Sequence, residues 1–185
     1  MSFMKPAFKA TLLSVCIGTF AFQQQAFAQT DPAQKNLPAL IQVAVGNKLV
    51  LQAQAEGTIT YECRKEKDPL TAYKWTMVKP QAVLKDSEGK EIGTYSGPPA
   101  RWSLKDNSFV TGSQVAVSPN GEKNIPLQLA KADVSGGLGE LTAITYIQRV
   151  NTKGGAAPKG KCSESNEGEK ADVNYSAQYR FWRGN

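Results

Sequence analysis

The strongest constraint on the fold of this chain is a strict two-residue alternation between Lys48 and Cys63. One parity is apolar or small and the other is mostly polar; the first set is Leu49, Leu51, Ala53, Ala55, Gly57, Ile59, Tyr61 and Cys63. Successive side chains of a strand point to opposite faces, so a period of two over this length predicts β structure with one buried face. Cys63 falls on the inward parity, which suits a buried disulfide.

Two turn signals bound and divide this stretch. Gly46-Asn47 is typical of a two-residue hairpin turn, and it separates the stretch from the apolar residues Ile41, Val43 and Val45. Glu56-Gly57 can break the stretch itself into two strands. We therefore expect a hairpin near residue 46 and an interruption near residue 57.

The remainder of the chain also reads as short strands separated by turn chemistry. Further strand-length runs are Thr76–Leu84, Phe109–Val117, Ile125–Ala130, Leu141–Val150 and the alternating, aromatic-rich Val173–Phe181. The run Leu141–Val150 is apolar on both parities, as expected for a strand covered on both faces. Leu127–Val134 is the one place where a helical turn or two is possible. The sequence predicts an all-β, single-domain antiparallel β-sandwich or barrel with one disulfide.

The first 28 residues have the anatomy of a cleaved secretory signal. Lys5 and Lys9 precede an uncharged apolar run, and Ala26-Phe27-Ala28 is a small-x-small cleavage site, so the mature domain is expected to span 29–185. An uncleaved anchor would need about 20 apolar residues, and this run is shorter. Cys16 lies inside the run and would be discarded. We expect a periplasmic or secreted protein without a membrane anchor after cleavage.

Cys63 and Cys162 are the two cysteines that would survive this processing. An even number of cysteines in an exported chain is most simply a disulfide, because the compartment is oxidising. A reactive thiolate or a metal pair would need basic or imidazole neighbours, and Arg64 is the only hint of one. The bridge is therefore the expected arrangement.

Histidine is absent from the chain, and this excludes several common enzyme designs. Ser-His-Asp triads, Cys-His dyads and His-ligated metal sites all require an imidazole. Removing Lys5 and Lys9 from the 22 basic residues leaves 20 against 16 acidic ones, a net charge of +4 that is scattered along the sequence. Nucleic-acid binding uses clustered Lys and Arg, so no nucleic-acid partner, metal or cofactor is expected.

Several landmarks resemble one known family. They are Tyr61-Glu62-Cys63, Trp75, Pro80, the run Gly93–Pro98, Trp102, the run Ile147–Gly155, Pro158 and Cys162. This pattern is similar to exported bacterial and fungal proteins catalogued as domain of unknown function number 3455, over nearly all of the mature chain. The resemblance implies one extracytoplasmic domain and no established activity or cofactor. Family members often carry histidine at the position of Tyr95. Any role that an imidazole has at this position across the family is therefore not expected in this chain.

One set of aromatic and polar residues forms the candidate ligand-binding site. Its members combine flat stacking faces with hydrogen-bond donors, as sites for sugars or small polar ligands do; they are Tyr95, Trp102, Tyr146, Gln148, Arg149 and Asn151. In the alternative interpretation, Arg149 pairs with a carboxylate to organise the loop 152–161, and Trp102 belongs to the core. The favoured hypothesis is a non-enzymatic module that binds a small polar ligand, a glycan or a protein at a loop end.

The alternative function is a carboxylate-based glycoside hydrolase acting on cell-wall or surface polysaccharide. Such an enzyme needs two carboxylates about 5 to 9.5 Å apart. Asp86, Glu88 and Glu91 are close in sequence, and Asp106 could approach them. However, Asp86, Glu88 and Asp106 lie in turn-forming contexts, where such residues serve the backbone.

Overall fold

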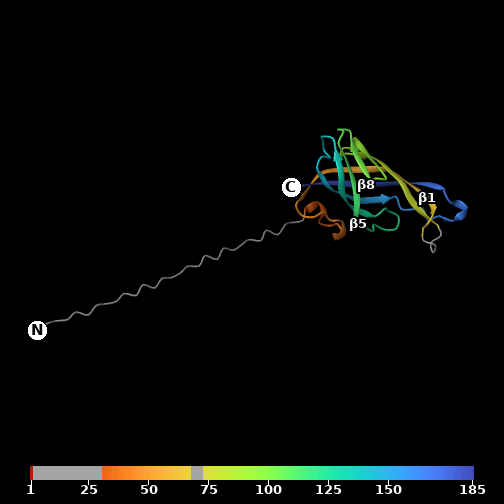
Figure 1. Cartoon of the computed structure of the whole chain (residues 1–185), viewed down its shortest axis with the longest axis horizontal. Helices are drawn as coiled ribbons and strands as arrows, with labels where there is room; N and C mark the ends of the chain where they lie inside the picture. Colours follow the sequence, from red (N-terminus) through yellow and green to blue (C-terminus); the bar gives the residue numbers. More distant parts are fainter. Residues whose placement is uncertain (2–30, 68–72) are drawn as a thin grey trace.

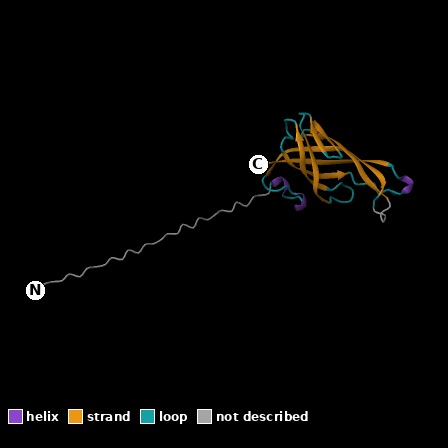
Figure 2. Cartoon of the chain, in the orientation of Figure 1, coloured by secondary structure: helices purple, strands orange, loops and turns teal. Residues whose placement is uncertain are grey.

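The computed structural model describes Met1 and residues 31–67 and 73–185, and it shows a closed antiparallel barrel (Figures 1 and 2). The strands follow one another around the barrel in chain order: β1 (Asn47–Lys65), β2 (Tyr73–Lys85), β3 (Glu91–Ser96), β4 (Arg101–Leu104), β5 (Phe109–Ser118), β6 (Leu127–Gly136), β7 (Ile144–Gly154) and β8 (Lys170–Gly184). Pairing of β1 with β8 closes it. The all-β antiparallel prediction is confirmed, and of its two alternatives the barrel is the one observed. The described residues include no helix long and apolar enough to cross a membrane.

The barrel interior is filled because small residues on one strand face large ones on the next. β1 places Ala53 opposite Tyr179 of β8, and Gly57 opposite Tyr175. The alternating inward parity predicted for both ends of the chain is confirmed. The inward-facing buried residues are Ala53, Ala55, Ile59, Tyr61 and Cys63 on β1 and Tyr175, Ala177, Tyr179 and Phe181 on β8, while Trp182 of β8 is buried on the outer side. A small barrel is packed in this way by its own side chains.

Two turn predictions in the first third of the chain are wrong. Gly57 does not interrupt β1, which runs unbroken from Asn47 to Lys65. The glycine is there because β1 and β2 approach closely, and a Cβ at this position would lie 2.0 Å from the carbonyl oxygen of Gln81. Residues 41–45 form no strand; the short 3₁₀-helix η2 (Ala39–Ile41) begins after Pro38, and the chain enters β1 without a preceding hairpin partner.

The N-terminal strap, residues 31–45, covers the outer wall of the barrel (orange in Figure 1). It contains η1 (Pro32–Gln34) and η2. Ile41 and Val43 form a second apolar cluster with Leu129, Val150 and Trp182, outside the barrel interior. The prediction that the β7 region is covered on both faces is therefore confirmed. Leu49 also faces this outer cluster, because an irregularity in the β1–β8 pairing between Leu49 and Leu51 changes the parity.

The region predicted as a possible helical turn is strand β6. Leu129 packs beneath the strap while Ala130 packs inside the barrel, so the two faces of an extended strand explain the apolar pattern. Strands β3 and β4, with six and four residues, were not among the predicted runs. Gly93 within β3 and the prolines between the two strands, Pro98 and Pro99, obscure the two-residue period.

The predicted disulfide between Cys63 and Cys162 is present, with a Cα–Cα distance of 5.4 Å. It ties the end of β1 to the long connection between β7 and β8, which also holds the 3₁₀-helix η3 (Glu164–Asn166). A structural disulfide is typical of an oxidising environment, outside the cytoplasm. Cys16 and the proposed cleavage site lie outside the described residues.

Candidate functional site

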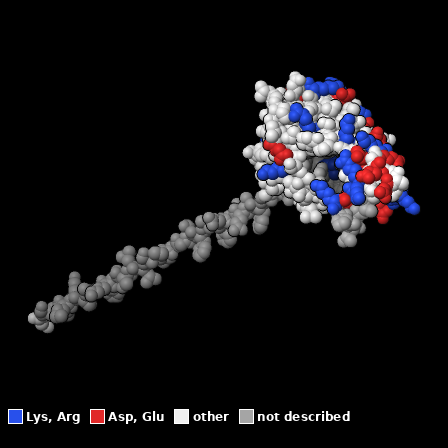
Figure 3. All heavy atoms as spheres, turned by 45° about the vertical axis from the view of Figure 1, so that its right-hand side comes forward, with Lys and Arg blue, Asp and Glu red and all other residues white. Residues whose placement is uncertain are grey.

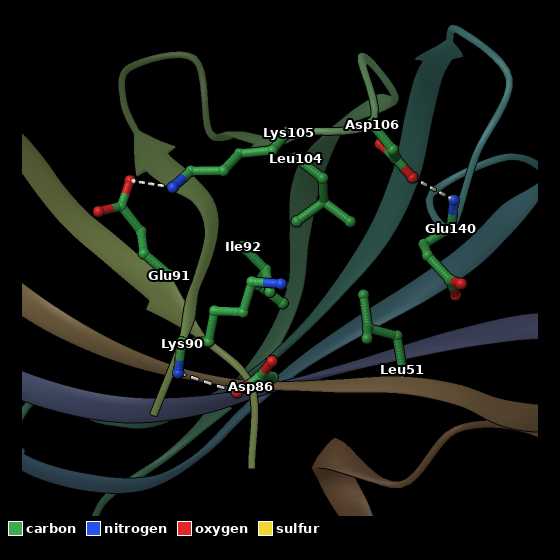
Figure 4. A pocket seen from close by; sticks show the side chains of 9 residues that line it. All are labelled: Leu51, Asp86, Lys90, Glu91, Ile92, Leu104, Lys105, Asp106 and Glu140. Carbon is green, nitrogen blue, oxygen red and sulfur yellow. Dashed lines mark hydrogen bonds and ion pairs between the residues drawn. The ribbon is translucent and has the colours of Figure 1, made fainter. Parts of the chain in front are cut away.

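A pocket of about 450 Å³ opens at one end of the barrel, and we call it the mouth pocket (Figure 4). The β2–β3 turn, the β4–β5 turn and the β6–β7 connection meet at this end, together with the first part of β1. The residues that line it are Leu51, Asp86, Lys90, Glu91, Ile92, Leu104, Lys105, Asp106 and Glu140. It is therefore a site at a loop end, held by four separate segments of the chain.

The mouth pocket has an apolar floor and a charged rim. Leu51, Ile92 and Leu104 are half-buried and pack against the interior core, and their remaining surface faces the pocket. Figure 4 shows these three side chains between the charged ones. On the rim, Glu91 pairs with Lys105 at 3.3 Å. The combination suits a ligand with an apolar body and a polar or charged end.

Asp86 and Asp106 serve their own turns. Asp86 Oδ1 accepts hydrogen bonds from the backbone N–H groups of Glu88 and Lys90, at 2.9 and 3.0 Å. Asp106 Oδ1 accepts from the Ser108 N–H at 2.8 Å and from its Oγ at 2.6 Å. These contacts are those of residues that organise turns through their side chains.

Asp106 is also held in its charged form. Its Oδ2 accepts from the backbone N–H of Glu140 at 2.8 Å, so the carboxylate links the β4–β5 turn to the β6–β7 connection. The hydrogen bond from the Ser108 hydroxyl, followed by the backbone donors, lowers the pKa of Asp106 below its ordinary value. A general acid needs a raised pKa, so this carboxylate is unsuited to protonate a leaving group at neutral pH.

Some of the carboxylates on the rim were candidates from the sequence, and one was not. Asp86, Glu91 and Asp106 of the hydrolase hypothesis all line the mouth pocket, whereas Glu88 does not. Glu140 was not anticipated; the only signal for it is that it directly follows the glycine-rich turn 136–139. Within the described ranges, no group of three or more carboxylate and cysteine side chains is arranged to hold a metal ion.

Three of the six sequence candidates lie together in the barrel interior. Tyr95 on β3 is directly opposite Trp102 on β4, with ring centroids 5.0 Å apart, and both are buried. Arg149 on β7 is opposite Tyr179 on β8 and is also buried. Arg149 Nε and Nη2 donate to the carbonyl oxygen of Pro126, at 3.2 and 3.1 Å, where the alternative interpretation expected a carboxylate. Trp102 lies in the core, as that interpretation anticipated.

The other three candidates lie on the outer wall. Tyr146 packs in the cluster beneath the strap. Gln148 is fully buried there, and its amide donates to the Ile41 carbonyl at 2.7 Å and accepts from Trp182 Nε1 at 2.9 Å. Asn151 is exposed and has a positive φ of 52°. None of the six lines the mouth pocket.

The surface of the molecule carries both charge signs. Figure 3 shows Lys and Arg side chains interspersed with Asp and Glu on the face that it presents. Several of these form exposed ion pairs, such as Lys85 with Glu56 and Lys159 with Glu122 at 3.2 Å. Exposed pairs of this kind contribute little to stability.

Comparison with known proteins places the chain in a family. No curated protein and no solved structure matches it. The sequence pattern of the family described as "Protein of unknown function (DUF3455)" matches residues 44–183, which include all eight strands except the last residue of β8, and both bridged cysteines. The match covers most of the chain and agrees with the resemblance carried by its cysteine, tryptophan and glycine landmarks. The chain therefore belongs to the DUF3455 family.

Proposed function

We propose that the protein is a non-enzymatic binding module, periplasmic or secreted, that holds a small amphipathic ligand in the mouth pocket. The observation that carries this proposal is the apolar floor of Leu51, Ile92 and Leu104 beneath a charged rim. The rim carries four carboxylates and two lysines, and this negative net charge favours a ligand with a neutral polar or positively charged end. The pocket lining contains no aromatic side chain for stacking on a sugar ring, which favours an apolar ligand body over a glycan.

Binding is favoured over hydrolysis because three of the four rim carboxylates are already engaged. Asp86 and Asp106 accept hydrogen bonds within their own turns, and Glu91 pairs with Lys105. The low pKa of Asp106 opposes a role as general acid. Retaining and inverting glycosidases both need one protonated carboxyl group.

The test uses N-phenyl-1-naphthylamine, a fluorescent probe with an apolar body, one amine group and no charge. Its fluorescence should rise on binding to the wild-type protein, and Ile92→Gln should weaken that binding about tenfold or more by removing apolar floor. Val115→Gln is the matched control, because Val115 is an exposed apolar residue on the outer wall of β5. Equal binding by Ile92→Gln and the wild type would show that the mouth pocket is not the site.

Hydrolysis is tested separately on peptidoglycan and common polysaccharides. The binding proposal expects no turnover by the wild-type protein. Turnover that is lost in both Asp86→Asn and Asp106→Asn would establish the hydrolase alternative instead.

The localisation part of the proposal combines the disulfide with the signal-like first 28 residues. Intact-mass measurement of protein from the periplasmic fraction or medium should give a chain that begins at Gln29 and lacks Cys16. A mass that includes residues 1–28, or an added lipid, would contradict this prediction.

A further inference from the structure

The barrel interior holds a positive charge without a negative partner. Arg149 is only 9% exposed. Its side chain donates hydrogen bonds to a neutral group, the Pro126 carbonyl. The salt bridges found among the described residues all involve other side chains, on the surface. The guanidinium is therefore buried with no salt-bridge partner among the described residues. Burying it without a counter-charge is strongly unfavourable.

Four buried tyrosines surround this arginine, and we call the group the tyrosine cluster: Tyr61, Tyr95, Tyr175 and Tyr179. The rings of Tyr95 and Tyr179 lie 5.1 Å apart, and Tyr179 is opposite Arg149 in the β7–β8 pairing. Arg149 acts electrostatically on all four phenols, lowering their pKa values against the larger effect of burial. The guanidinium and the hydroxyl groups therefore share one region of the interior.

The tyrosines do not supply the missing negative charge. Burial raises the pKa of Tyr175 to about 12 and that of Tyr179 well above its ordinary value. Both phenols are consequently neutral at physiological pH, and each carries an O–H that can donate. Arg149 therefore provides a positive charge, and the tyrosine cluster provides hydrogen-bond donors.

Several of these donors have no partner. Within the described structure, the buried hydroxyl groups of Tyr175 and Tyr179 lie near each other but have no other hydrogen-bond partner, and Nε1 of Trp102 has none. The Trp102 ring is in contact with Tyr179, at 5.3 Å between centroids. Tyr61 is different, since its hydroxyl donates to the Gly155 carbonyl at 2.7 Å. Buried polar groups in proteins are nearly always hydrogen-bonded, so orphan donors beside an unpaired cation point to a ligand that accepts.

We propose that Arg149 and the tyrosine cluster bind a small monovalent anion, either a halide or the carboxylate of a small acid. One negative charge would neutralise the guanidinium, and its lone pairs would accept from the Tyr175 and Tyr179 hydroxyls. The cluster comes close to the surface at Tyr95, which also lines a surface pocket of about 190 Å³ with Met77, Pro80, Gly97, Pro98 and Ala100. This site is separate from the mouth pocket and does not depend on the function proposed for it.

The experiment measures thermal unfolding of the full mature protein in sodium bromide and, separately, in sodium formate. Ionic strength is kept constant with sodium gluconate, whose anion is too large for the interior. The melting temperature of the wild type should rise with the concentration of the bound anion. Stabilisation by bromide alone identifies a halide site, by formate alone a carboxylate site, and by both a general monovalent-anion site; each result supports the proposal.

Variants separate a specific site from general salt effects. Arg149→Met should abolish the anion-dependent rise, whereas Arg64→Met should retain it, because Arg64 is exposed and pairs with Glu62. Tyr175→Phe and Tyr179→Phe keep the ring and remove only the hydroxyl, so they remain informative if Arg149→Met does not fold. Each should raise the apparent dissociation constant of the anion about tenfold. If neither anion raises the wild-type melting temperature, or if the rise is unchanged in both Phe variants, the proposal is overturned.

Discussion

Gly57 lies where the backbones of β1 and β2 approach most tightly along the interior face. A Cβ at this position would be 2.0 Å from the Gln81 carbonyl oxygen and 2.6 Å from the Ala82 Cα, both of them backbone atoms that cannot turn aside. Gly57→Ala should therefore lower the free energy of unfolding by about 3 kcal/mol or more, at the upper end for overpacking. Urea denaturation checks this. Gly160→Ala is the control, because a Cβ there meets nothing within 4 Å, and its effect should be small.

Gln148 connects the strap to the barrel through buried hydrogen bonds. Its amide donates to the Ile41 carbonyl and to Gln34 Oε1, and its own oxygen accepts from Trp182 Nε1. Gln148→Leu would leave the Ile41 carbonyl and Trp182 Nε1 without these partners, whereas Gln34 Oε1 would still accept from the Val43 N–H. Each buried group left unpaired costs about 1 to 3 kcal/mol. We expect a loss of several kcal/mol in urea denaturation. Gln81→Leu, at an exposed position with one long hydrogen bond of 3.4 Å, should change stability little; similar losses in both variants would contradict the assigned role.

The sequence could indicate what kind of residues Gln148 and Arg149 are, but not what they contact. Adjacent residues of a strand face opposite sides, and here one side is the space beneath the strap and the other is the barrel interior. The partner Gln34 is 114 positions away, in a segment that carries no strand pattern. The six candidates, chosen by residue type, therefore divide between the barrel interior and the outer wall. None of them lies in the mouth pocket, which is built from the turns of three different strand pairs.

At the scale of elements, the disulfide is the one covalent link between the end of β1 and the β7–β8 connection. It joins residues 99 positions apart, and loss of a native bridge typically costs about 2 to 5 kcal/mol, mainly by freeing the unfolded chain. Cys63→Ser and Cys162→Ser should each lower the melting temperature by many degrees.

The double variant Cys63→Ser/Cys162→Ser provides the control for this prediction. Both single changes remove the same bond, so the double variant should be no less stable than the worse single one. Thiol titration of the denatured, unreduced mature protein should find no free thiol. Two reactive thiols per chain would show that the bridge does not form in the mature protein.

The long alternating strands and the doubly covered β7 were predictable, whereas the short strands and the character of β6 were not. β1 and β8 have 19 and 15 residues, and each repeats its two-residue period often enough to be unambiguous. β3 and β4 are too short to show a period, and β4 has only four residues. β6 mixes both faces, because Leu129 and Ala130 are buried on opposite sides of the same wall. The strap makes one wall of the barrel two-sided, and local sequence does not reveal where it docks.

At the scale of the whole molecule, the barrel has two different ends. The mouth end carries the apolar floor with its charged rim, and the opposite end carries the disulfide and the long β7–β8 connection. Between them, the aromatic interior is built around small residues on β1, which leave room for the rings of β8. The tyrosines of this interior couple the stability of the entire barrel to pH.

The barrel should lose stability between about pH 10 and pH 12. Burial raises the pKa of Tyr175 from 10.0 to about 12, so its neutral form is favoured in the folded state. Below pH 10 both folded and unfolded chains keep the proton, and stability is unaffected. Above pH 10 the unfolded chain loses the proton while the folded one retains it, and the balance shifts toward unfolding. A difference of two pKa units corresponds to a loss on the order of 2 to 3 kcal/mol from this residue.

Urea denaturation at a series of pH values from 8 to 12 tests the coupling, and Tyr175→Phe isolates its source. Removing the hydroxyl should make the variant less sensitive to alkaline pH by roughly the amount assigned to Tyr175, because phenylalanine has no proton to lose in either state. Lysines also titrate near this range, but they are common to both proteins and cancel in the comparison. Tyr73 is only partly buried at the start of β2, where its hydroxyl donates to Glu167, so Tyr73→Phe should keep most of the wild-type pH dependence. If the free energy of unfolding falls equally with pH in the wild type and in Tyr175→Phe, the buried phenol of Tyr175 is not the source of the pH dependence.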